Sequence, residues 1–186
     1  MRGPEDDAIL TLEPLIEAVR DGVGGSGWEL SGLQKTTSHQ FEGRWAGDST
    51  RSAYLFFHLP TGPEWASLDV FLDETSQGLS GNLALVVECR PLGEQGAVVA
   101  ALEELATLTR ATLPQEYRTP ITVRFRLERP DTEAASAQTE VRFKVRIPRS
   151  CIGAGAPAVT DMAAAAAKAL VGLLVDPRLA PFLDLG

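Results

Sequence analysis

The sequence is poor in the residues that carry most enzyme chemistry. Its 186 residues include two histidines, His39 and His58, and two cysteines, Cys89 and Cys151. No H-x-x-x-H, C-x-x-C or H-E-x-x-H spacing occurs, so the sequence predicts no transition-metal site. The G-x-S-x-G and P-loop patterns are also absent. We therefore assign no catalytic residue, expect no metal or cofactor, and favour a protein that is not an enzyme.

Long apolar runs are missing too. A membrane helix needs roughly 20 apolar residues, and the longest candidate, 162–175, is shorter and mostly alanine. Glu5, Asp6 and Asp7 are acidic where a secretory signal peptide would be basic. The net charge of −8 argues against charge-driven binding to nucleic acid. These features predict a cytoplasmic protein that does not bind a membrane, and they disfavour nucleic acid as its partner.

The two cysteines suggest no disulfide. Cys89 lies on the apolar face of a predicted strand, and Cys151 lies in a loop rich in glycine and proline. A domain of this size in a reducing compartment needs no disulfide. Arg149 could lower the pKa of the Cys151 thiol and make it reactive, but a loop cysteine without a role is the simpler interpretation.

The composition is typical of one globular domain over residues 1–186, with 44% hydrophobic and 23% charged residues. Apolar residues at helical spacing predict an N-terminal helical segment within residues 1–22. Pro14 either kinks this helix or lies in its first turn, and Gly22 is its predicted C-cap. Residues 22–27 match G-x-G-x-x-G, but no strand precedes them and no helix follows, so we interpret them as a flexible connection.

Residues 39–90 contain four predicted strands, at 39–46, 52–60, 65–73 and 82–90. The first two flank a turn at 47–50, which would place Ala46 opposite Ser52. The strand at 52–60 is apolar on both faces, with Tyr54, Phe56 and His58 on the second face. We therefore expect it to be covered on both sides, by a loop, the N-terminus or a partner subunit.

A predicted helix at 94–113 follows and ends at Pro114. Residues 120–148 form a β-hairpin with strands at 121–128 and 140–147, and a final helix spans 160–175 with Thr160 as its N-cap. These elements predict an α+β fold. It is a two-layer sandwich with a mostly antiparallel sheet of about six strands and helices on one face.

The polar face of the hairpin is basic. Residues 120–149 carry seven bases and four acids, whereas the rest of the chain carries ten bases and twenty-one acids. The cations that share this face are Arg124, Arg126, Arg142, Lys144 and Arg146. If Ile121 pairs with Ile147, Arg124 faces Lys144. Arg126 then faces Arg142, and a shift of two residues in register would relieve part of this repulsion.

Three interpretations of this basic face stay open. It can be a solvated outer face, a docking surface for an acidic partner such as a second copy of the chain, or a platform for nucleic acid or anions. The last is disfavoured because no aromatic residue stands among the cations to stack on bases.

A second set of residues could form a pocket or an interface. Its members, aromatic apart from one histidine, are Tyr54, Phe56, His58, Trp65 and Phe71. Aromatic residues with a few polar groups line ligand pockets, and they also fill cores and strand positions. The sequence leaves these alternatives open.

The order of helix, four strands, helix, two strands and helix, with a low pI, resembles type III secretion chaperone-like domains, apart from one extra strand near the N-terminus. The resemblance implies a chaperone-like protein-binding module, and an immunity or scaffold protein has the same features. The leading hypothesis is a non-enzymatic module that binds an acidic protein partner and forms a homodimer. The alternative is a small-molecule-binding domain or an enzyme with an aromatic pocket around His58.

Overall fold

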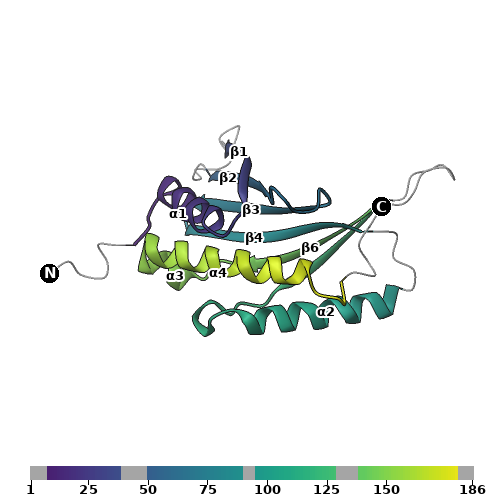
Figure 1. Cartoon of the computed structure of the whole chain (residues 1–186). Coiled ribbons are helices and arrows are strands. Elements are labelled where there is room, and N and C mark those ends of the chain that lie inside the picture. The colour runs from purple at the N-terminus through teal and green to yellow at the C-terminus, as the bar shows by residue number, and fades with distance from the viewer. Residues whose placement is uncertain (1–7, 39–49, 90–94, 129–137, 180–186) are drawn as a thin grey trace.

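The computed structural model describes residues 8–38, 50–89, 95–128 and 138–179. The elements are α1 (Leu12–Gly24), β1 (Glu29–Ser38), β2 (Thr50–His58), β3 (Ala66–Thr75), β4 (Gly78–Cys89), α2 (Gln95–Thr112), β5 (Thr122–Glu128), β6 (Gln138–Arg146), α3 (Arg149–Ala154) and α4 (Ala156–Leu174). The six strands form one antiparallel sheet in the order β1-β2-β3-β4-β6-β5, with the helices on one face (Figure 1). The predicted α+β sandwich is confirmed.

The core lies between the helices and the face of the sheet that they cover. Burial alternates along β2, where Ala53, Leu55 and Phe57 are buried and the residues between them are exposed. β6 repeats the pattern with Val141, Phe143 and Val145. This period of two arises because successive side chains of a strand point to opposite faces.

The start of α1 is tied to the sheet. The Leu12 amide donates a hydrogen bond of 2.7 Å to Glu74 Oε2 on β3, which satisfies one of the free donors at the helix start. Arg51 on β2 forms an ion pair with Glu13, and its Nη1 atom lies 3.6 Å from Glu74 Oε1. Pro14 falls in the first turn, as one of the two predicted alternatives has it.

The predicted end of α1 is wrong. The helix continues to Gly24, and Gly25 is its C-cap, so the first residues of the expected flexible connection are helical. Gly22 lies against α4 instead, where a Cβ atom would be 2.3 Å from the Thr160 carbonyl oxygen. Thr160 Oγ1 donates to the Ala18 carbonyl at 3.1 Å in the same contact. Gly22 therefore serves the close approach of two helices.

The strand that pairs with β2 was not predicted. It is β1, with Leu33 opposite Leu55, whereas the predicted strand at 39–46 and its turn lie outside the described residues. Both leucines on β1, Leu30 and Leu33, are about 40% exposed because β1 is an edge strand. Trp28, just before β1, is buried in the core.

The C-terminal helix begins earlier than predicted. α4 starts at Ala156, after Gly155 with φ of 103°, a backbone conformation that favours glycine. Thr160 is therefore inside the helix and not its N-cap. By length and composition alone α4 could span a membrane, a test that a buried core helix also passes. Its buried residues, Met162 and Leu170 among them, belong to the core.

Candidate functional site

One face of the sheet is not covered by the helices, and we call it the open face. The paired strands place rows of residues across it, such as Gly32, Phe56, Asp69, Ala84, Lys144 and Thr122. The next row contains Gln34, Tyr54, Phe71, Asn82 and Arg146. The open face thus collects most of the residues that the sequence singled out.

Tyr54, Phe56 and Phe71 form an aromatic patch on the open face. The rings of Tyr54 and Phe71 lie 4.9 Å apart at an angle of 46°. Tyr54 and Phe56 are each 37% exposed, so the described residues do not supply the cover expected on the second face of this strand. Exposed neighbouring aromatic side chains are typical of surfaces that bind another molecule.

The two other residues of the predicted pocket lie where β2 ends and before β3 begins, and His58 shares the open face with Tyr54 and Phe56. His58 is exposed at the end of β2, with its Nε2 atom 3.8 Å from Glu29 Oε2. Trp65 precedes β3 and packs against the hydrophobic core. The five residues therefore do not enclose His58 in the way that the predicted pocket requires.

Arg124, Arg142, Lys144 and Arg146 form a basic stripe on β5 and β6. The register differs by two residues from the one with Ile121 opposite Ile147, and it is the shift that was expected to relieve repulsion, since Arg124 faces Arg142 and Arg126 faces Glu140. This register removes one of the two expected cation pairs, which lowers the repulsion. The side chain of Arg126 lies outside the described residues. Partial burial, together with Arg124 and Arg146, lowers the pKa of Lys144.

Arg142 links the basic stripe to β3. Its Nε atom donates to Glu140 Oε1 at 2.6 Å, and its Nη1 atom lies 3.7 Å from Asp69 Oδ2. Asp69 and Arg142 flank β4, where Ala84 and Val86 are 5% and 7% exposed although they belong to the open face. Long polar side chains thus cover the middle of this face, as arginine stems commonly do.

The charges on the open face divide into two halves. On β1, β2 and β3 the described acids are Glu29, Asp69 and Asp73, and no lysine or arginine is among the described residues there. On β4, β6 and β5 the basic stripe outweighs the two described acids, Glu88 and Glu140. One half is therefore acidic and aromatic, and the other is basic.

Asp69 should respond to pH because burial raises its pKa, with Glu140 adding to the rise while Ser67 and Arg142 oppose it. A raised pKa means that the folded state binds the proton more tightly, so the buried carboxylate is unfavourable at neutral pH. This destabilising contribution to the free energy of unfolding disappears as the pH falls through the pKa that Asp69 has in the folded state and then below its ordinary value of 3.8.

We therefore predict that Asp69→Asn leaves the protein at least as stable as wild type at pH 7. Below about pH 4, wild type should gain stability relative to the variant, because its carboxyl group is then protonated. Urea unfolding of both proteins at the two pH values measures this difference. A loss of more than about 1 kcal/mol in the variant at pH 7 would instead mean that the Arg142 pair stabilises the fold.

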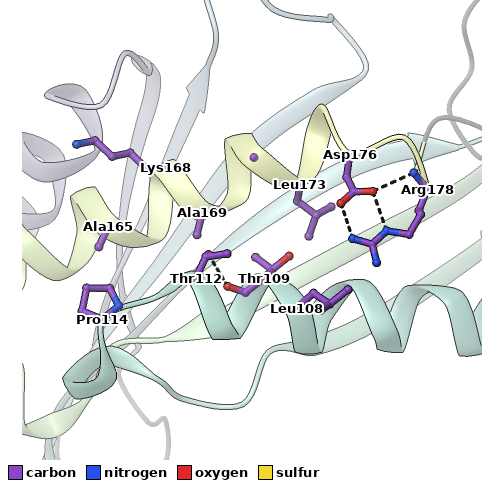
Figure 2. A pocket seen from close by; sticks show the side chains of 11 residues that line it. Leu108, Thr109, Thr112, Pro114, Ala165, Lys168, Ala169, Leu173, Asp176 and Arg178 are labelled. Carbon is purple, nitrogen blue, oxygen red and sulfur yellow. Dashed lines mark hydrogen bonds and ion pairs between the residues drawn. The ribbon is translucent and has the colours of Figure 1, made fainter.

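A cavity of about 490 Å³ lies between α2 and α4 (Figure 2). Residues that line it include Leu108, Thr109, Thr112, Lys168, Leu173 and Arg178. The two threonine hydroxyls donate to carbonyl groups of their own helix, Thr109 to Leu105 and Thr112 to Thr109, both at 2.7 Å. The sequence predicts both helices from the spacing of their apolar residues, but it does not show that α2 and α4 face each other across this cavity.

One end of this cavity carries a local ion pair. Arg178 donates two hydrogen bonds from its guanidinium group to Asp176, at 2.9 and 2.7 Å (Figure 2). These bonds lower the pKa of Asp176 to about 2. The polar groups at this end and the two threonines are thus bound within the chain, which leaves few polar groups to orient a ligand.

The described residues offer little catalytic chemistry. Cys151 is buried and free, and it lies in α3 and not in the predicted loop. Burial raises the pKa of its thiol, so activation by Arg149 is not supported. Among the described ranges, no three His, Cys, Asp or Glu side chains cluster as metal ligands.

Comparison of the chain with protein-family models, curated proteins and solved structures found no match.

Proposed function

We propose that the chain is a non-enzymatic protein-binding module that self-associates through its open face. The observation that carries the proposal is the exposed aromatic patch that shares with the basic stripe the sheet face left uncovered by the described residues. Aromatic residues and arginine are enriched where proteins bind each other. An antiparallel sheet that faces water usually alternates apolar and polar residues, and β2 does not.

A second copy of the chain is the partner that the charges favour. The protein is acidic overall, with a net charge of −8, so its surface complements a basic stripe. Nucleic acid is disfavoured because the aromatic patch lies beside Asp69 and Asp73, which would repel phosphate groups. A small-molecule ligand in the α2–α4 cavity is the second candidate, supported by a volume within the usual range for ligand pockets.

Lysine acetylation can locate the binding face, because the chain has lysines in three places. Lys144 lies on the open face, Lys35 lies on the other face of β1, and Lys168 lines the α2–α4 cavity. We expect acetylation of Lys144 to slow as protein concentration rises, while Lys35 and Lys168 react at constant rates. Each lysine is compared with itself, so differences in intrinsic reactivity cancel.

Two outcomes of this experiment would count against the proposal. Protection of Lys168 in place of Lys144 would move the interface to the helical side of the molecule. A rate at Lys144 that stays constant over all protein concentrations, as at Lys35 and Lys168, would mean that the open face stays free of a second copy.

A further inference from the structure

Resting on the proposed function, we infer how the second copy docks. The two open faces stack with a two-fold axis that runs parallel to the strands, between β3 and β4. This operation places β2 of each copy over β6 of its partner and β3 over the partner's β4. The aromatic patch of one copy then lies on the basic stripe of the other, and the same contact occurs twice.

The charge distribution selects this axis over the alternative. A two-fold axis in the same plane but perpendicular to the strands would place β6 over β6. The cations Arg142, Lys144 and Arg146 would then face the same cations of the partner, which is strongly unfavourable at a desolvated contact. An axis parallel to the strands brings the acidic half of each face onto the basic half of the other.

The rows across the sheet predict which residues meet. Rotation about an axis parallel to the strands preserves the position along the strand, so residues of one row face the same row of the partner. Phe56 and Lys144 share a row, as do Tyr54 and Arg146. Each aromatic ring therefore meets a cation of the partner, and such a cation–π contact contributes about 0.5–2 kcal/mol.

The outer strands repeat this complementarity. In the strand register Glu29 on β1 lies opposite His58, and Arg124 on β5 lies opposite Arg142. Both of these positions are at the same end of the sheet. In the stacked dimer β1 lies over the partner's β5, so Glu29 approaches a partner cation. The attraction extends from the aromatic centre to the rim.

The area of the open face is sufficient for a stable dimer. Six strands at a spacing of about 4.8 Å span roughly 29 Å. The seven paired residues of β2 and β3 extend the face by roughly 23 Å along the strands. The product is on the order of 700 Å² per copy, close to the roughly 800 Å² that each partner contributes to a typical stable interface.

Charge substitutions at Phe56 and Lys144 test the arrangement. Phe56→Lys and Phe56→Glu remove the same exposed ring, so they differ in the sign of the new charge. The introduced lysine would face the partner's basic stripe, and the introduced glutamate would complement it. We expect the dissociation constant of the Phe56→Glu dimer to be at least about tenfold lower than that of the Phe56→Lys dimer.

The double variant Phe56→Lys with Lys144→Glu should restore the dimer, with a dissociation constant within about threefold of that of Phe56→Glu. Positions 56 and 144 lie three strands apart within one chain, roughly 14 Å, where screening by salt weakens their direct interaction. A coupling between them in the dissociation constant therefore reports a contact across the interface. Sedimentation equilibrium measures wild type, both Phe56 variants, Lys144→Glu alone and the double variant, and circular dichroism checks that each is folded.

The outcomes separate this inference from the proposed function. A wild-type chain that remains monomeric overturns both. A wild-type dimer in which both Phe56 variants weaken association alike, with no rescue by Lys144→Glu, overturns this arrangement and leaves the proposed function standing. Rescue supports the arrangement. An axis perpendicular to the strands would place β2 over the partner's β2 and β6 over the partner's β6, so positions 56 and 144 would not face each other.

Discussion

Replacing Tyr54 and Phe56 together by serine is expected to raise the dissociation constant of the dimer at least about 100-fold. The two rings are each 37% exposed and form the apolar centre of the open face. In a two-fold dimer each substitution removes its contact twice, so a modest loss per ring has a large total effect. Sedimentation equilibrium of wild type and variant measures the change.

The same double variant should keep its fold. Neither ring belongs to the buried core, and the ring contact that the monomer loses is the one between Tyr54 and Phe71. We expect the free energy of unfolding to fall by about 1 kcal/mol. The matched control replaces Leu10 and Val175, which are 79% and 76% exposed and lie outside the sheet, by serine. An effect of the control on association equal to that of the Tyr54 and Phe56 variant would contradict the assignment.

Gly22→Ala is expected to destabilise the fold by about 1–3 kcal/mol. The new Cβ atom would lie 2.3 Å from the Thr160 carbonyl oxygen and 2.9 Å from the Ala163 Cβ atom. Because the oxygen belongs to the backbone of α4, the two helices must separate. The melting temperature should fall by about 2–4 °C for each kcal/mol, measurable by circular dichroism.

Gly24→Ala is the control for that substitution. Gly24 belongs to the last turn of the same helix, but outside its own helix backbone and chain neighbours no atom of the described residues lies within 4 Å of its added Cβ. Alanine has a higher helix propensity than glycine, so this variant should be neutral or slightly more stable. If Gly22→Ala proved as stable as Gly24→Ala, the close contact between α1 and α4 would not be present in solution.

The alternation of side chains predicted much of the open face. The period of two in β2 and β6 assigns Tyr54, Phe56, Lys144 and Arg146 to the face opposite the buried residues, and the structure agrees. That assignment depends on local geometry, since successive residues of a strand point to opposite faces. The helices at 95–112 and 156–174 were predicted within a few residues because helical spacing is also a local pattern.

Features that depend on distant residues were not predicted. β1 has a weak apolar pattern and, as an edge strand, leaves Leu30 and Leu33 about 40% exposed. The role of Gly22 depends on α4, which follows it by more than a hundred residues. The hairpin register depends on how β5 meets β6, and no local pattern distinguishes registers two residues apart.

The sequence also could not separate a core from an interface. Aromatic residues at strand positions 54, 56 and 71 have the same pattern whether a helix, a ligand or another chain covers them. The structure places the described helices on the opposite face, so none of them covers these three aromatic residues. It also joins the aromatic patch and the basic stripe on one face through the strand order β2-β3-β4-β6.

The mass of the wild-type chain in solution tests the central claim most directly. Light scattering behind a sizing column, over a range of protein concentrations and at low and high salt, measures it. The account predicts a dimer of about twice 19.9 kDa at low salt. It also predicts weaker association at high salt, because the acidic half of each open face meets the basic half of the other. A mass of 19.9 kDa at every concentration and salt would contradict self-association through this face.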